Sequence, residues 1–125
     1  MKRPLSQLEL AVMETVWALG ECSSAEVIEA FRRRRPLAVT TIRTVLTKIL
    51  RKGYIFKVPS VERGFRYKPA VGRDIVAGRS LRTLLREFFE GSPSRAISHL
   101  VRDESIDDEE LERIRRVLPS RRGKK

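Results

Sequence analysis

The sequence contains almost no cysteine or histidine, which argues against several kinds of site. Among its 125 residues, the only cysteine is Cys22 and the only histidine is His99. A single cysteine cannot form an internal disulfide, and the two residues together are too few for a Cys/His zinc site. We therefore expect neither a metal nor a cofactor, and we interpret Cys22 as a small, partly buried residue.

Long apolar runs are also missing. Charged residues follow the apolar pairs Val45-Leu46 and Leu84-Leu85 within a few positions, whereas a helix that spans a bilayer needs roughly 20 apolar residues. The first four residues lead directly into an amphipathic pattern, without the apolar segment of a signal peptide. These absences predict a cytoplasmic protein without membrane insertion.

The motifs of common enzyme classes are absent as well. The chain has no glycine-rich nucleotide-binding pattern and no convincing Ser-His-Asp or Cys-His set. Its acidic residues concentrate at positions 103–112, where the pattern is typical of a solvated helix end. The sequence therefore predicts no catalytic residues and no enzyme activity.

Positive charge dominates the composition, especially in the first part of the chain. Lys and Arg number 27 against 16 Asp and Glu, for a net charge of +11. Residues 1–70 hold 14 basic and 6 acidic side chains, whereas residues 71–125 hold 13 and 10. This bias indicates a polyanionic partner, either nucleic acid or an acidic membrane surface.

Apolar spacing and helix-capping signals predict three helices followed by a β-hairpin in residues 1–71. The expected elements are a helix over 5–19 capped by Ser6 with Glu9, an extended link at 21–23, a helix that starts after Ser23 or Ser24 and ends before Pro36, a helix over 39–52, and strands over 54–58 and 65–68. This order is typical of a winged helix-turn-helix, a mainly α fold with a small β-hairpin wing.

The helix expected over 39–52 is the most informative segment. At 100° per residue, its apolar residues fall on one side, whereas the other side carries only hydroxyls and cations. No acidic residue occurs between Pro36 and Val61, which is unusual for an ordinary solvated face. The predicted DNA-facing residues of this helix are Thr40, Thr41, Arg43, Thr44, Thr47, Lys48 and Arg51. From the hairpin, Lys57, Arg63 and Arg66 are expected to reach the flanking backbone or the minor groove.

Residues 72–118 show apolar stripes at helical spacing and predict a three-helix dimerisation segment, followed by a disordered basic tail at 119–125. Three helices this short cannot bury two adjacent phenylalanines among themselves. A second copy of the chain would bury them, and a symmetric dimer is the commonest arrangement. The residues expected at the dimer interface are Leu81, Leu84, Leu85, Phe88, Phe89, Ile97, Leu100, Leu111 and Ile114.

Three motifs resemble the penicillinase repressors, a family that also includes the methicillin-resistance repressor. Residues 5–9 with Val12-Met13 and Trp17 are similar to the opening helix of the family, residues 41–49 (Thr-Ile-Arg-Thr-Val-Leu-Thr-Lys-Ile) to its recognition helix, and residues 52–55 to the exit into the wing. The resemblance covers about residues 5–118. It implies a dimeric repressor that binds palindromic operator DNA and regulates antibiotic resistance.

Carried over by position, the resemblance implies that Arg43 and Thr44 contact base edges, while Thr41, Thr47 and Lys48 serve phosphates or neighbouring bases. Arginine can bind guanine O6 and N7, and a threonine methyl can pack on a thymine methyl. Family members often carry lysine where this chain has Thr40, so the chain departs from the family at one expected contact, and the resemblance does not give the operator sequence. Trp17 is expected in the core, without a base contact.

The resemblance also implies relief of repression by proteolysis, after a membrane sensor detects a β-lactam. The corresponding bond here joins His99 to Leu100, where relatives have Asn-Phe, so the alternative is that His99 is only a helix residue at the dimer interface. A copper-responsive branch of the family has a cysteine-rich C-terminal tail, which this sequence lacks. Two further alternatives are a winged-helix regulator that responds to a small-molecule ligand and a non-specific binder of nucleic acid or acidic surfaces.

Overall fold

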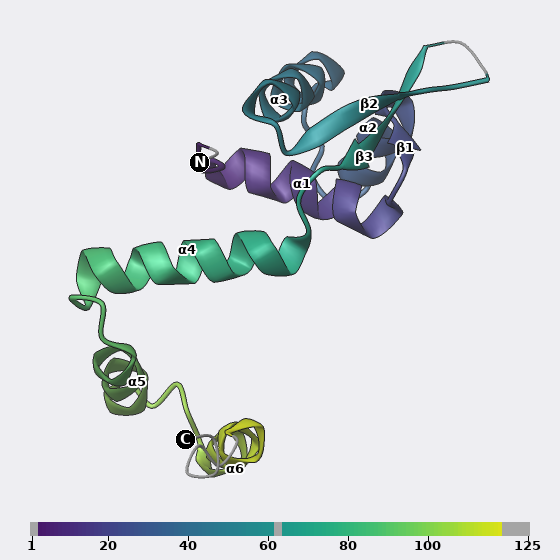
Figure 1. Ribbon diagram of the computed structural model, residues 1–125. Helices are drawn as coiled ribbons and strands as arrows, with labels where there is room; N and C mark the ends of the chain where they lie inside the picture. The colour runs from purple at the N-terminus through teal and green to yellow at the C-terminus, as the bar shows by residue number, and fades with distance from the viewer. Residues whose placement is uncertain (1–2, 62–63, 119–125) are drawn as a thin grey trace. The chain divides into compact units, whose positions relative to one another are not determined.

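The structure is a computed structural model that describes residues 3–61 and 64–118. It is mainly helical (Figure 1), with the elements α1 (Gln7–Leu19), β1 (Cys22–Ser23), α2 (Ser24–Arg32), α3 (Val39–Lys52), β2 (Ile55–Pro59), β3 (Phe65–Pro69), α4 (Arg73–Phe88), α5 (Pro93–Arg102) and α6 (Asp108–Val117).

The chain divides into an N-terminal unit, Met1–Ser80, and a C-terminal unit, Leu81–Lys125. The division falls within α4, whereas the domain boundary predicted after residue 71 lies just before this helix. The predicted basic tail at 119–125 lies outside the described residues.

Capping boxes start the first two helices. The Ser6 hydroxyl accepts a hydrogen bond from the backbone N–H of Glu9, whose carboxylate accepts one from the Ser6 N–H in return. Ser23 and Glu26 form the same pair at the start of α2. Such reciprocal bonds satisfy two N–H groups that would otherwise lack partners. The predicted Ser6 cap is thus confirmed, and of the two serines expected to begin the second helix, Ser23 is the cap.

A three-stranded antiparallel sheet follows the order β1-β3-β2. The structure contains the hairpin that the sequence predicts, formed by β2 and β3, and it pairs Lys57 with Tyr67 and Phe56 with Lys68. On its other side, β3 pairs with β1, which aligns Cys22 with Tyr67. The sequence indicated only an extended link at this point, because a two-residue strand has no pattern of its own.

The core of the N-terminal unit lies between α1, α2, α3 and the sheet. Its buried hydrophobic residues are Val12, Met13, Val16, Cys22, Val27, Ile28, Phe31, Ile42, Val45, Leu46, Ile49, Tyr54, Ile55 and Val76. Trp17 packs against this cluster and donates a 2.9 Å hydrogen bond from Nε1 to the Val71 carbonyl oxygen. Trp17 therefore satisfies its one polar group while it covers the core.

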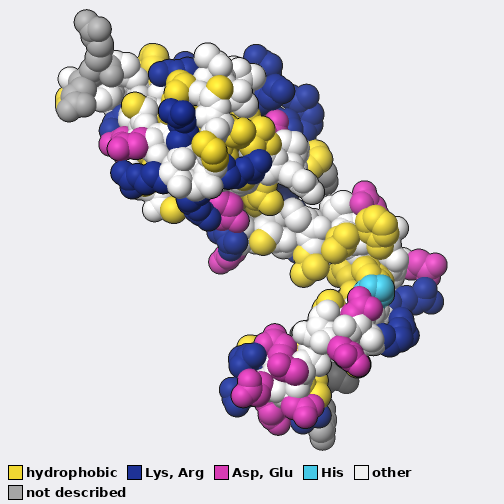
Figure 2. Space-filling view, turned by 180° about the vertical axis from the view of Figure 1, so that it is seen from behind, with side chains coloured by type: hydrophobic (Ala, Val, Ile, Leu, Met, Phe, Trp, Pro, Cys, Tyr) yellow, Lys and Arg dark blue, Asp and Glu magenta, His cyan; other side chains and the backbone are white. Residues whose placement is uncertain are grey.

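The start of α4 belongs to the core of the N-terminal unit. Val76 is buried and packs into this core, while its neighbour Ile75 is exposed. Neighbouring helix positions point about 100° apart, so the face that α4 turns toward the core decides which of them is buried. From Leu81 to Leu118 no residue is buried, and Figure 2 shows a group of hydrophobic side chains on this surface.

Candidate nucleic-acid interface

Helix α3 is held with one side in the core. Ile42, Val45, Leu46 and Ile49 are buried at helical spacing, and α3 lies against α1 and α2 (Figure 1). The helix ends at Gly53, whose φ of 89° is the left-handed conformation that glycine adopts without strain. Burial on one side leaves the opposite side of α3 toward solvent.

The outer face of α3 carries the seven residues that the sequence predicts for DNA contact: Thr40, Thr41, Arg43, Thr44, Thr47, Lys48 and Arg51, all of them exposed. The helix contains no acidic residue. Within the described part of the chain, none of its three exposed cations forms an ion pair. This face therefore offers unneutralised positive charge to an anionic partner.

Two of the threonines on this face are fixed by the helix itself. The Thr44 hydroxyl donates to the Thr40 carbonyl oxygen at 3.0 Å, and the Thr47 hydroxyl donates to the Arg43 carbonyl oxygen at 3.0 Å. Each hydroxyl proton is thereby used within the helix, which leaves the hydroxyl lone pairs and the methyl group for an external partner. Such side chains can accept a hydrogen bond or pack against a thymine methyl.

The C-terminal end of α3 is fastened to the start of α1. Lys52 Nζ donates to Glu9 Oε1 at 2.6 Å and to the Pro4 carbonyl oxygen at 2.8 Å, and the Tyr54 hydroxyl donates to the Arg3 carbonyl oxygen at 2.6 Å. Burial by itself would raise the pKa of the Glu9 carboxyl, but the hydrogen bonds from Lys52 and the Ser6 backbone outweigh it, so the pKa is lowered. Glu9 is thus a carboxylate that fixes α3 on the core.

The hairpin places its basic side chains in different surroundings. The Lys57 ammonium lies 4.6 Å from the centre of the Phe65 ring, in a cation–π contact on the surface of the wing. Arg66 instead donates to the Glu21 carboxylate at 3.2 Å and to the Glu26 carboxylate at 3.2 Å. Arg63 lies outside the described residues. These ion pairs of Arg66 could not be predicted from the sequence, because 40 or more residues separate it from both acids.

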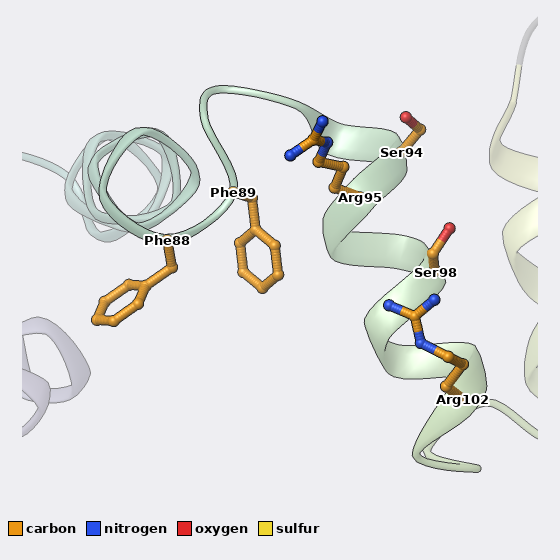
Figure 3. Close-up of a pocket in the computed structure, with 6 residues that line it drawn as sticks. All are labelled: Phe88, Phe89, Ser94, Arg95, Ser98 and Arg102. Carbon is orange, nitrogen blue, oxygen red and sulfur yellow. The ribbon is translucent and has the colours of Figure 1, made fainter.

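The residues predicted for dimerisation form an apolar surface in the C-terminal unit and on α4. Leu81, Leu84, Phe88, Ile97, Leu100 and Leu111 are exposed, and Leu85, Phe89 and Ile114 are partly exposed. Phe88 and Phe89 line a hollow with Ser94, Arg95, Ser98 and Arg102 of α5, and Figure 3 shows the Phe89 side chain between the end of α4 and α5, while the Phe88 side chain points away from α5. A surface with this much exposed apolar area is typical of an interface.

The bond predicted for cleavage lies inside α5. His99 Nε2 is 3.2 Å from Asp103 Oδ2, one helical turn further along, and the His99 ring meets the Phe89 ring edge-on at 5.8 Å between centroids. Both His99 and Leu100 are exposed. In the described part of the chain, no three His, Cys, Asp or Glu residues are grouped so that they could hold a metal, and no helix is long and apolar enough to cross a membrane.

Comparison with known proteins extends the sequence resemblance. The family model described as "Penicillinase repressor" matches residues 5–120. The "Transcriptional regulator BlaI" of Mycobacterium tuberculosis is 36% identical over 116 residues, which cover 91% of this chain and 82% of that protein. The "Penicillinase repressor" of Staphylococcus aureus is 23% identical, over 91% of this chain and 90% of that protein.

Solved structures match the N-terminal half of the chain. The DNA-binding domain of the repressor BlaI in solution covers 58% of this chain and 90% of its own, with 28% identity and a TM-score of 0.51. The monomeric form of Bacillus licheniformis BlaI, in complex with the blaP half-operator, covers 59% of this chain and 89% of its own, with 26% identity and a TM-score of 0.52.

Proposed function

Because the chain belongs to the penicillinase repressor family, we propose that it acts as a homodimer whose two copies of α3 bind a palindromic operator. Family membership makes it a DNA-binding transcriptional repressor of the β-lactam-resistance type, and not an enzyme. The predicted resemblance is thereby confirmed. We further propose that the dimer contacts its operator in the cytoplasm.

The two sides of α3 carry the proposal. The buried side fixes the helix on the core, and the exposed side is acid-free with three unpaired cations among the described residues. In a helix-turn-helix, the recognition helix lies in the major groove, where base edges present a distinct pattern for each base pair. We assign base contacts to Arg43 and Thr44, and contacts with phosphates or neighbouring bases to Thr40, Thr41, Thr47, Lys48 and Arg51.

The wing supplies flanking contacts in this proposal. Lys57 is exposed, and its ammonium, which contacts the Phe65 ring and no acidic residue in the described part of the chain, is proposed to bind a phosphate. We propose the same role for Arg63, which lies outside the described residues. Arg66 remains a candidate, but it must leave Glu21 and Glu26 to bind DNA, so its contribution is expected to be smaller than that of Lys57.

The apolar residues that the described C-terminal unit leaves exposed support the proposed dimer. Phe88 is 72% exposed and Leu81 is 57% exposed, which is unfavourable in water for side chains of this size. Packing of the same surface from a second copy would remove both from solvent in a symmetric interface. A dimer also doubles the number of phosphate contacts and requires a two-fold operator.

Relief of repression by a membrane sensor-protease system would act on this interface. Cleavage between His99 and Leu100 would divide α5 and remove α6 from the dimer surface. Since a bond within a helix must unwind before a protease can bind it, the proposal predicts local opening of α5 before cleavage. Intact mass measurement of the chain from induced cells distinguishes cleavage from the alternative, in which His99 is only an interface residue.

Selection of binding sites from random duplexes tests the proposed function, followed by fluorescence-anisotropy titrations at two salt concentrations. The expected result is a palindromic site whose half-sites are about one helical turn, or a near multiple of it, apart. Uniform affinity for all sequences, with a steep loss at the higher salt concentration, would instead identify a non-specific electrostatic binder. Binding that depends on an added small molecule would favour a ligand-responsive regulator.

A further inference from the structure

The end of α2 carries four consecutive arginines, Arg32 to Arg35, that the proposed recognition by α3 and the wing does not use. All four are exposed. Four neighbouring positive charges repel one another, so such a tract is more stable when an anionic partner lies near it. The four arginines differ in whether another side chain of the protein interacts with them.

Three of the four have a neighbour within the described fold. Arg33 Nη2 is 3.3 Å from Glu29 Oε2, and the Arg35 guanidinium lies 5.8 Å from the centre of the Phe31 ring. Arg34 lies in the electrostatic field of Glu14 on α1, where it contributes to the lowered pKa of that carboxyl, after the larger effect of the hydrogen bond from Arg73. Within the described residues, Arg32 has neither an ion pair nor a side-chain hydrogen bond.

Arg32 also shares a surface with the proposed base-reading residue. An open hollow of about 590 Å³ is lined by Ala25, Ile28, Glu29 and Arg32 of α2, by Arg33 and Pro36 of the connection that follows, and by Val39 and Arg43 of α3. Ala25, Ile28 and Arg32 recur at helical spacing, so one face of α2 continues into the N-terminal half of α3. Arg32 and Arg43 are the two cations of this hollow that lack an acidic partner among the described residues.

We propose that Arg32 binds a phosphate of the operator backbone beside the bases that Arg43 contacts, with Arg33 at the edge of the same site. This inference rests on the proposed function and extends the DNA surface from α3 onto α2. In helix-turn-helix proteins, the helix before the recognition helix crosses the sugar-phosphate backbone, which is the position of α2 here. A guanidinium can donate two parallel hydrogen bonds to one phosphate, and it remains charged at all physiological pH values.

The tract provides its own matched control. Arg32→Gln and Arg34→Gln each remove one charge from the same tract, two positions apart, but of these two residues only Arg32 lines the hollow with Arg43. The affinity of the full chain for the selected operator and for a random duplex is measured by anisotropy over a series of salt concentrations. Each phosphate contact contributes about 0.9 to the slope of log affinity against log salt concentration, and a dimer contains each contact twice.

We expect Arg32→Gln to reduce that slope by about two on both duplexes, and Arg34→Gln to reduce it by clearly less. Equal reductions would show that the tract acts only through its net charge and would overturn the assignment. No change with Arg32→Gln would also overturn it, because a lost phosphate contact must appear in the slope. Circular dichroism of both variants verifies that the fold is retained.

The same titrations separate this inference from the proposed function. If the unsubstituted chain binds operator and random duplexes equally, the proposal of sequence-specific repression fails, whatever the slopes of the variants are. If it prefers the operator and Arg32→Gln leaves the slope unchanged, only the Arg32 site fails.

Discussion

Lys52 Nζ lies 2.6 Å from Glu9 Oε1, and this contact joins the end of the proposed recognition helix to the start of the first helix. The two side chains are only 17% and 6% exposed. Glu9 also accepts the hydrogen bond that closes the capping box of α1. One carboxylate thus begins the first helix and fixes the last turn of α3.

Replacement of Lys52 by methionine is expected to reduce the free energy of unfolding by about 2 kcal/mol, because it leaves the Glu9 carboxylate largely buried without its cation. Urea denaturation followed by Trp17 fluorescence measures this loss. Lys48→Met is the matched control, since Lys48 lies one turn earlier on the exposed side of the same helix. An equal and small effect of both substitutions would contradict a stabilising role for the ion pair.

The loss of stability in Lys52→Met is expected to depend on pH, because it involves the Glu9 carboxyl. Its pKa is lowered in the folded chain, so its contribution to stability is present above the ordinary value of 4.5 and is lost as the pH falls through the lowered pKa. The difference in unfolding free energy between the unsubstituted chain and Lys52→Met is therefore expected to shrink as the pH decreases from about 7 to about 3.5. A difference that stays constant over this interval would rule out Glu9 as its source.

The cap of α2 provides a test of local structure. Ser23→Ala removes the hydroxyl that accepts from the Glu26 N–H and is expected to destabilise the chain by about 1 kcal/mol. Ser24→Ala, at the first position inside the helix, is expected to change stability by less than about 0.5 kcal/mol. Thermal unfolding of the two variants would contradict the assigned cap if Ser24→Ala had the larger effect.

The proposed dimer predicts a strong effect of one exposed aromatic residue. Phe88→Ser removes an apolar side chain from each copy, so the dimer dissociation constant is expected to rise about a hundredfold or more. Analytical ultracentrifugation over a concentration series measures this constant. Glu87→Ser, the neighbouring exposed position on α4, is the control and should leave it nearly unchanged. If Phe88→Ser dimerises as tightly as the unsubstituted chain, the interface lies elsewhere.

The sequence predicts the helices and the hairpin because their signals are local. The Ser6 cap, the left-handed stop at Gly53 and the buried side of α3 all depend on residues within a few positions of one another. The outer face of α3 follows from the same periodicity, since the buried positions determine the exposed ones.

Contacts between distant segments could not be predicted in this way. The pairing of β1 with β3 and the ion pair of Glu9 with Lys52 depend on how the elements pack, and no short pattern encodes them. The choice of Val76 over Ile75 as the core residue of α4 depends on its orientation. For the same reason, the run of arginines at 32–35 can be read in the sequence, but the hollow that Arg32 shares with Arg43 cannot.

The most direct measurement of the central claim is a comparison of Arg43→Ala with the unsubstituted chain on the selected operator and on a random duplex. If Arg43 contacts a base edge, the Arg43→Ala variant loses about 1–3 kcal/mol of binding free energy on the operator, while its binding free energy on the random duplex changes little. Arg43 is exposed on α3, so its replacement is not expected to unfold the chain. Unfolding would also weaken binding to both duplexes, and not to the operator alone. Equal losses on the two duplexes would contradict sequence recognition by α3.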